Sequence, residues 1–229
     1  LFRLADLYLK RLNYLKNSLK IAILSYRSAP FGGGQGIYVY ELSKALKELG
    51  HQVDIISGPP YPQLIPGIKL IKLPGLNLFS TFKFRDRLDL FLNKKNKSFD
   101  DWYEFGSTLL GGFPELQTFG NRAHSYLLDK TYDIVIDNQS ISYGALKIQD
   151  SFPLVEIMHH PISKDYYYDL KFAKGILQRI SKIRWYSFLK MQKSSAKKIN
   201  VVVTPSMNSK EDIHIDFQVP MENIQVIPN

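Results

Sequence analysis

Short apolar runs rich in β-branched residues alternate with amphipathic helical patterns along most of the chain, and this alternation restricts the fold more than any other feature. The runs at 20–26 (KIAILSY) and 52–57 (QVDIIS) flank a helical pattern whose apolar face includes Val39, Leu42 and Leu46. A strand, a helix and a strand in this order require a parallel pair joined by a right-handed crossover. Further strands are predicted at 68–73, 132–137, 152–159, 199–206 and 223–228. We therefore expect an α/β fold with one doubly wound, mostly parallel Rossmann-like sheet.

Three segments lie outside this alternation. Residues 1–19 carry leucines at helical spacing and are predicted to form an amphipathic helix in front of a domain at 20–229. Its basic residues are dispersed and it has no continuous apolar block, so it does not resemble a signal peptide. Residues 76–120 are predicted to be a partly helical insertion, and residues 166–198 to be one long helical stretch. The chain begins with Leu rather than Met, which fits a fragment of a longer protein.

Composition removes several classes of function. The chain has 229 residues, a formal net charge of +9 and no cysteine. Without cysteine there are no disulfides, no zinc–thiolate sites and no thiol nucleophile, and a cytoplasmic location is expected. No apolar run reaches the roughly 18 residues that a membrane-spanning helix needs.

A glycine-rich loop, APFGGGQG at 29–36, follows the first predicted strand. It fails the dinucleotide fingerprint G-x-G-x-x-G, because the sixth position counted from Gly34 is Val39. The phosphate-binding pattern G-x-x-x-x-G-K-[ST] is also absent. The loop still leads into a helix N-terminus, where bare backbone N–H groups favour an anion. The alternative is a surface loop whose glycines only serve turn geometry.

Polar side chains gather just after the predicted strands, where ligands bind in sheets of this type. His159 and His160 follow one strand, and Asn138 and Gln139 follow another. A neutral imidazole can shuttle a proton, and amides suit sugar hydroxyls. Asp165 either anchors the loop after the histidines or is merely solvated there. Histidines held by backbone groups, and capping amides in a turn, are the structural alternatives. A metal site is not expected, because no carboxylate or third histidine stands at ligand spacing.

Several stretches together resemble family 4 glycosyltransferases of the GT-B architecture. They are GGGQGIYVYELSKALKELGHQVDIIS, PLVEIMHH, VVVTPSMNSKEDI and IQVIPN, in the order and spacing of the family. The resemblance covers about 20–229, with 76–120 matched least. It implies that this chain is the N-terminal, acceptor-side half of a GT-B fold. The family's donor-binding domain, with its Glu-x7-Glu motif, would follow this chain.

The resemblance also implies roles for individual residues. His159 takes the place of the family's cleft histidine and is the expected catalytic residue. The loop residues Gly33, Gly34, Gln35 and Gly36 would face the donor. The residues expected at the acceptor are Asn138, Gln139, His160 and Asp165. The implied reaction is retaining transfer from a nucleotide-sugar to a glycan or lipid-linked acceptor, with no cofactor beyond that co-substrate.

The stretch 171–198 holds nine basic residues and no acidic one. Read as a helix, it places Lys174, Lys182 and Lys193 broadly on one face with Trp185 among them. Such a face suits an anionic membrane surface, so a peripheral position on the cytoplasmic side of a membrane is expected. An ordinary solvated lysine face is the alternative, and no nucleic-acid motif is present. For the whole chain, the alternative to an enzyme is a stand-alone Rossmann-like module that binds carbohydrate or an anionic surface.

Overall fold

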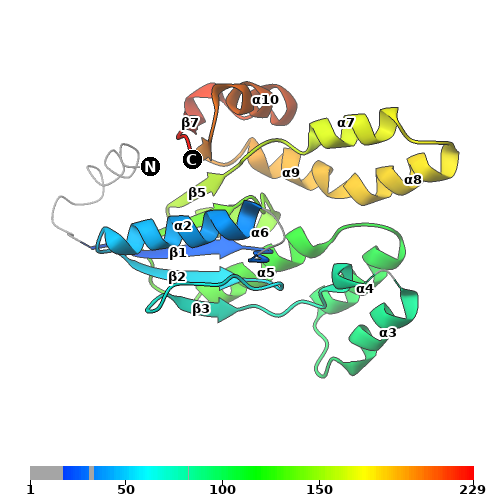
Figure 1. Cartoon of the computed structure of the whole chain (residues 1–229), viewed down its shortest axis with the longest axis horizontal. Helices are drawn as coiled ribbons and strands as arrows, with labels where there is room; N and C mark the ends of the chain where they lie inside the picture. Colours follow the sequence, from blue (N-terminus) through cyan, green and yellow to red (C-terminus); the bar gives the residue numbers. More distant parts are fainter. Residues whose placement is uncertain (1–17, 31–33, 82) are drawn as a thin grey trace.

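Seven parallel strands form one sheet at the centre of the molecule. The computed structural model describes residues 18–30, 34–81 and 83–229, so most of the predicted N-terminal helix lies outside the described residues. The strand order is β3-β2-β1-β4-β5-β6-β7 (Figure 1). The strands are β1 (Lys20–Ser25), β2 (Gln52–Ser57), β3 (Lys69–Lys72), β4 (Ile134–Asn138), β5 (Leu154–Ile157), β6 (Val202–Thr204) and β7 (Ile224–Val226). All strand pairs are parallel, which confirms the predicted doubly wound sheet.

The strand order places a topological switch point between β1 and β4. From β1 the chain winds outward through β2 to β3, and it then returns to add β4 on the other side of β1. The connections after β1 and after β4 therefore leave the sheet in opposite directions. A crevice opens between them at the carboxyl ends of these strands, where ligands of doubly wound folds bind.

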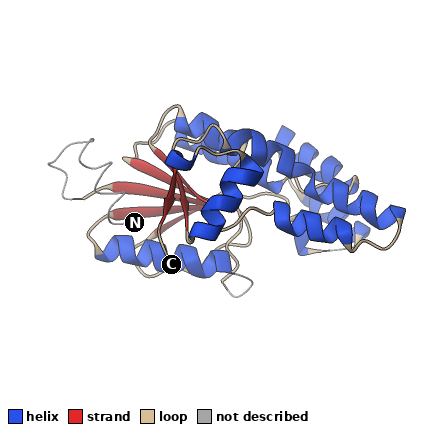
Figure 2. Ribbon diagram, turned by 90° about the horizontal axis from the view of Figure 1, so that it is seen from above, coloured by secondary structure: helices blue, strands red, loops and turns tan. Residues whose placement is uncertain are grey.

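Helices cover both faces of the sheet, as Figure 2 shows for strands enclosed between helical layers. On one face, α2 (Gly34–Glu48) packs its apolar stripe against alternate residues of β1 and β2, such as Ile23 and Ile55. On the other face, α5 (Glu115–Leu127) and α6 (Tyr143–Gln149) pack against the intervening residues. The same face continues over α9 (Leu189–Ala196) and α10 (Met207–Phe217). Side chains that alternate along each strand thus supply both cores.

The segment predicted as a partly helical insertion forms two helices, α3 (Phe84–Asn93) and α4 (Phe99–Leu109), after the short 3-10 turn η1 (Leu78–Ser80). Ser98 and Asp101 form a capping box that fixes the start of α4. In Figure 1 the two helices extend past the arrowheads of the strands. The insertion therefore stands at the same edge of the sheet as the switch point.

The prediction of one long helix over 166–198 is wrong. The structure has α7 (Ser163–Lys171), α8 (Ile176–Trp185), the 3-10 turn η2 (Tyr186–Phe188) and then α9. Gly175 has φ 86°, a conformation that only glycine adopts readily, and it turns the chain between α7 and α8. The two helices form a hairpin that projects from the carboxyl edge of the sheet (Figure 1), and neither contains a buried residue.

The last connection, η3 (Met221–Asn223), leads into β7 at the edge of the sheet. Among the helices of the described ranges, none is long and apolar enough to cross a bilayer.

Candidate functional site

His159 lies two residues beyond β5 and contacts Asn138, the last residue of β4. The His159 Nε2 and Asn138 Oδ1 atoms are 3.0 Å apart, and the His159 ring meets the Tyr38 ring of α2 edge-on at 4.6 Å between centroids. Burial, with a smaller contribution from His160, lowers the pKa of His159. The imidazole is therefore neutral at neutral pH. With Nε2 donating to Asn138 in this amide orientation, Nδ1 remains an acceptor.

Gln139 connects the ends of β4 and β5. It has φ 63° and extends its amide toward the loop after β5. Its Oε1 accepts from the His159 backbone N–H and its Nε2 donates to the His160 carbonyl, both at 3.4 Å. The exposed His160 ring lies 3.7 Å from Asp165 in the first turn of α7. The structure thus brings Asn138, Gln139, His159 and His160 together, with Asp165 beside them.

The glycine loop borders a separate cavity of about 250 Å³. It is lined by Tyr26, Arg27, Ala29, Gly34, Gln35, Gly36 and Pro60. Gly34 opens α2 with free space around it, whereas a Cβ at Gly36 would clash with the Ala29 carbonyl. Gly36 is therefore required for close packing, and the first described residues of α2 line the cavity at the positive end of the helix dipole. Gly33 lies outside the described residues.

Among the described residues, Arg27 is the one cationic side chain that lines this cavity, and sequence reasoning missed it. Its Nη1 pairs with Glu115 Oε2 at 2.9 Å, at the start of α5. Burial raises the pKa of Glu115 to about 7, and the pairing with Arg27 opposes this rise. The position of Arg27, directly after β1, was the available signal, because side chains there face the crevice.

A second cavity, of about 170 Å³, lies beside the histidines. Gln139 and His160 line it together with a set of aromatic side chains that includes Phe113 and Trp185. Tyr26 lines both this cavity and the glycine-loop cavity. Donor residues predicted from the glycine loop therefore line one cavity, and the predicted acceptor residues Gln139 and His160 line the other, with Tyr26 between them.

The residues predicted for a membrane surface do not share one face, because the stretch is not one helix. Lys174 is exposed in the turn between α7 and α8, and Lys193 is exposed on α9. Lys182 pairs with Asp169 at 2.7 Å. Trp185 packs against Phe79 and Phe113, at 5.0 and 5.2 Å between ring centroids, and belongs to the aromatic cluster at the second cavity.

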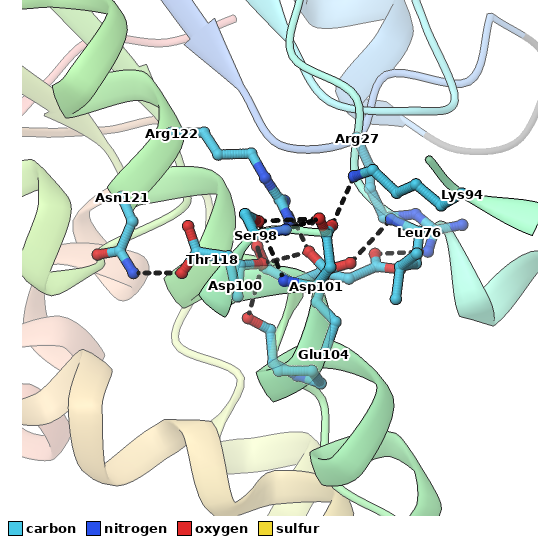
Figure 3. Close-up of polar contacts among 12 residues, drawn as sticks. Arg27, Leu76, Lys94, Ser98, Asp100, Asp101, Glu104, Thr118, Asn121 and Arg122 are labelled. Atoms are coloured by element: carbon cyan, nitrogen blue, oxygen red, sulfur yellow. Dashed lines mark hydrogen bonds and ion pairs between the residues drawn. The ribbon is translucent and has the colours of Figure 1, made fainter. Parts of the chain in front are cut away.

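A buried ionic network attaches α4 to α5 (Figure 3). The carboxylates of Asp101 and Glu104 are 1% and 2% exposed, and Arg122 of α5 pairs with them at 3.2 and 2.6 Å. Lys94 adds a second cation at 2.5 Å from Asp101, and Thr118 donates to Glu104 at 2.6 Å. This network holds the insertion against the helix that begins with Glu115.

The side chains at the crevice suit polar recognition and proton transfer. A neutral imidazole, two amides, one guanidinium and a helix N-terminus surround it. In the part of the chain that the structure describes, no group of three or more His, Asp or Glu residues could hold a metal ion. The arrangement can bind hydroxyls and an anionic group side by side.

Comparisons with known proteins identify the family and the fold. A family model described as Glycosyltransferase Family 4 matches residues 32–229. A curated protein of Mycolicibacterium hassiacum, named MMP alpha-(1->4)-mannosyltransferase, is 40% identical over 214 residues, which is 92% of this chain and 51% of the relative. This chain therefore spans about half the length of that relative.

Two solved structures share the fold. Sucrose-phosphate synthase of Thermosynechococcus elongatus aligns with a TM-score of 0.55 and 19% identity, over 93% of this chain and 48% of that protein. The catalytic domain of starch synthase IV from Arabidopsis thaliana, bound to ADP and acarbose, aligns with a TM-score of 0.50 and 16% identity, over 93% of this chain and 52% of that one. At these identities the likeness concerns the fold alone.

Proposed function

Because this chain belongs to Glycosyltransferase Family 4, we propose that it forms the acceptor-side half of a retaining glycosyltransferase. The enzyme would move a sugar from a nucleotide-sugar to a glycan or glycolipid acceptor, with no cofactor beyond this co-substrate. The observation that carries the proposal is the contact between His159 and Asn138 at the carboxyl ends of β4 and β5. The cavity that Gln139 and His160 line beside this pair is separated by Tyr26 from the cavity that offers an arginine and a helix N-terminus to an anion.

The reaction breaks the bond between the anomeric carbon and the diphosphate and forms a bond from that carbon to an acceptor hydroxyl oxygen, whose proton passes to the leaving diphosphate. The α2 N-terminus and Arg27 would stabilise the leaving diphosphate, since fixed N–H groups and charges act strongly in a crevice from which water is largely excluded. The free Nδ1 of His159 would accept a hydrogen bond from a sugar hydroxyl and hold it in place. Asn138 keeps the ring in the required tautomer.

His159→Ala in the full-length enzyme tests this assignment. Misplacement of a reacting group by about 1 Å can cost about a hundredfold in rate, so we expect turnover to fall by about that factor while the melting temperature changes little. His124→Ala is the matched control, because His124 lies in the last turn of α5, at the opposite edge of the sheet. Turnover near the wild-type level in His159→Ala would remove this residue from the site.

The donor sugar is proposed to be mannose. The support is the M. hassiacum mannosyltransferase, which is 40% identical over 92% of this chain. A transfer assay of the full-length enzyme with nucleotide-linked mannose, glucose and galactose tests it. Faster transfer from glucose or galactose would contradict the proposal.

The second candidate function, a carbohydrate-binding module without transfer, makes a different prediction for the same experiments. A module would bind a glycan as an isolated chain and would release no nucleotide from any nucleotide-sugar, even when the full-length protein is assayed. Nucleotide release that requires an added acceptor supports the transferase.

We also propose that the hairpin of α7 and α8 contacts an anionic membrane surface. Phe172, Ile176 and Leu177 at its tip are 71–84% exposed. Exposing three neighbouring large apolar side chains to water is unfavourable, and such patches commonly mark an interaction surface. Lys171, Lys174 and Arg179 surround them, and these three form no ion pair with another described residue. Each basic side chain near an anionic surface contributes about 1 kcal/mol of binding free energy. The apolar tip would add to this by inserting into the membrane interface.

Co-sedimentation with vesicles tests this surface. We expect salt-sensitive binding to vesicles with anionic lipid, weak binding to neutral ones, and loss of binding when Lys171, Lys174 and Arg179 are replaced by Glu. Lys197→Glu is the control, because Lys197 is exposed at the end of α9, outside the hairpin. Equal binding to neutral vesicles, or binding unchanged by the triple substitution, would contradict the proposal.

A further inference from the structure

Two fully buried carboxyl groups, Asp137 and Glu156, stand side by side in the centre of the sheet. They are register partners on β4 and β5, and each side chain is 0% exposed. Asp137 Oδ1 and both oxygens of Glu156 are buried with no donor at hydrogen-bond geometry within the described residues. Two adjacent carboxyls without a cation cannot both ionise, so they share a proton.

The electrostatics of the pair agree with this arrangement. Burial raises the pKa of Asp137 to about 6, and burial together with the charge of Asp137 raises the pKa of Glu156 well above its usual value. These shifts favour a proton on Glu156, beside Asp137, at neutral pH. The backbone amides of Gln139 and Ile141 approach Glu156 and favour its charged form, but they do not outweigh burial.

The pair lies on one face of the sheet, and the contact between Asn138 and His159 lies on the other. Along β4, Val135 packs toward α5 and α6 whereas Ile136 packs toward α2, so Asp137 and Asn138 point to opposite faces. Along β5, Ile157 packs toward α2, which places Glu156 on the same face as Asp137. The pair is therefore directly behind the site without lining it.

The turn from β4 to α6 passes over the pair in a strained conformation. Gln139 has φ 63° and Ile141 has φ 49°, and a β-branched residue in the left-handed region is a true outlier. Ser140, between them, donates its hydroxyl to Asp137 Oδ2 and accepts a 3.5 Å contact from Gln192 of α9 at its carbonyl. Surrounding structure must hold such a turn, and the carboxyl pair is the anchor at its centre.

The geometry points to Glu156 as a positioning residue: its proton bridge to Asp137 anchors the turn that holds Asn138 and Gln139 against His159. Ser140 transmits the anchoring, because it is one residue from Gln139 and bonded to Asp137. Gln139 in turn reaches the backbone of His159 and His160. Only the predicted effect on transfer rests on the proposed function.

Comparing Glu156→Gln with Glu156→Leu tests this role. Glutamine keeps a neutral donor to Asp137, whereas leucine keeps the volume and removes the donor. The first readout is the NMR signal of the His159 ring Cε1–Hε1 group in this chain, with its pH titration. We expect both to be unchanged in Glu156→Gln, and the ring signal to shift and titrate at a different pH in Glu156→Leu.

Ile224→Ala is the matched control, because Ile224 is buried on β7, with β6 between it and Glu156, so its truncation disturbs the core away from the carboxyl pair. It should lower stability and leave the His159 signal in place. Should Glu156→Leu fail to fold, Ser140→Ala removes the same anchor with a smaller change and should shift the His159 signal in the same direction.

Turnover of the full-length enzyme is the second readout. A displacement of about 1 Å can cost about a hundredfold in rate, so Glu156→Leu should fall by about that factor and Glu156→Gln should stay near wild type. An unchanged His159 signal in Glu156→Leu and Ser140→Ala would overturn the inference, as would an equal shift in Glu156→Gln. A wild-type protein without transfer activity would instead refute the proposed function, while the NMR comparison would still decide the positioning role.

Discussion

Arg122→Ala is the substitution that most directly tests how the insertion is attached to the domain. The Arg122 guanidinium is 16% exposed and bridges Asp101 and Glu104, which are almost completely buried. Glu104 also accepts from the Leu76 backbone N–H at 2.8 Å and from Thr118, so its position is fixed even without the arginine. Removing Arg122 therefore leaves a buried carboxylate that cannot turn toward water.

The magnitude follows from that geometry. Breaking a buried ion pair by removing one partner costs about 3–5 kcal/mol, because the remaining charge is buried without compensation. Asp101 retains Lys94, so most of the loss comes from Glu104. Typical domains have a free energy of unfolding of about 5–15 kcal/mol, so this one change removes a large share. At about 2–4 °C per kcal/mol for a chain of this length, the melting temperature should fall by roughly 6–20 °C.

Thermal unfolding followed by circular dichroism measures this effect. Arg85→Ala is the control, because Arg85 is an exposed arginine of α3 and should leave the melting temperature unchanged. Arg122→Lys should fall between wild type and Arg122→Ala, because an ammonium group cannot bridge both carboxylates as the planar guanidinium does. A melting temperature for Arg122→Ala within about 2 °C of wild type, or about 1 kcal/mol, would refute the argument that the network is buried and tightly coupled.

Two further predictions concern the glycine-loop cavity. Gly36→Ala should destabilise the fold by about 1–3 kcal/mol, because its Cβ clashes with Ala29. Gly34→Ala should be neutral or stabilising by up to about 1 kcal/mol, because its Cβ meets open space at a helix start. Equal melting temperatures of the two variants would contradict the clash. The pKa of Glu115 is about 7 in the folded state and 4.5, its ordinary value, in the unfolded state, so between these pH values the folded state binds the extra proton. The free energy of unfolding of the wild type therefore falls as pH rises from about 4.5 to about 7. Glu115→Gln removes this pH-dependent loss of stability, so the stability of the variant relative to wild type should rise by up to about 3 kcal/mol from about pH 4.5 to pH 7. A difference in melting temperature that does not change with pH would contradict the raised pKa of Glu115.

The fold could be predicted because its signals are local. Each strand is a short run of β-branched residues, each connecting helix has its own apolar face, and the parallel sheet follows from the order of the two. The region of the site could be predicted for the same reason, because residues that directly follow strands share one edge of a parallel sheet. Asn138, Gln139, His159 and His160 meet there as this rule requires.

Features that depend on contacts across the sheet could not be predicted. Nothing local in the sequence indicates that Asp137 and Glu156 become register partners, or that Arg27 pairs with a glutamate 88 positions away. The break between α7 and α8 was missed because the basic residues on both sides suit one helix equally well. Gly175 was the available signal, since glycine readily adopts the positive φ that this turn into α8 requires.

The hairpin of α7 and α8 should open locally in solution more readily than the rest of the molecule. Its helices have 9 and 10 residues, shorter than the roughly 12–15 residues at which isolated helices become even marginally stable. Neither buries a residue, so polar contacts hold them. Asp169 pairs with Lys182 and Tyr186 within the hairpin, and Ser163 and Lys164 at the base of α7 contact Asp216 and Asp212 of α10. Amide hydrogens of the hairpin should therefore exchange with solvent through local opening, at a much lower free energy than amides of β1 and β4. The projecting arm can melt and reform while the sheet and the crevice stay folded.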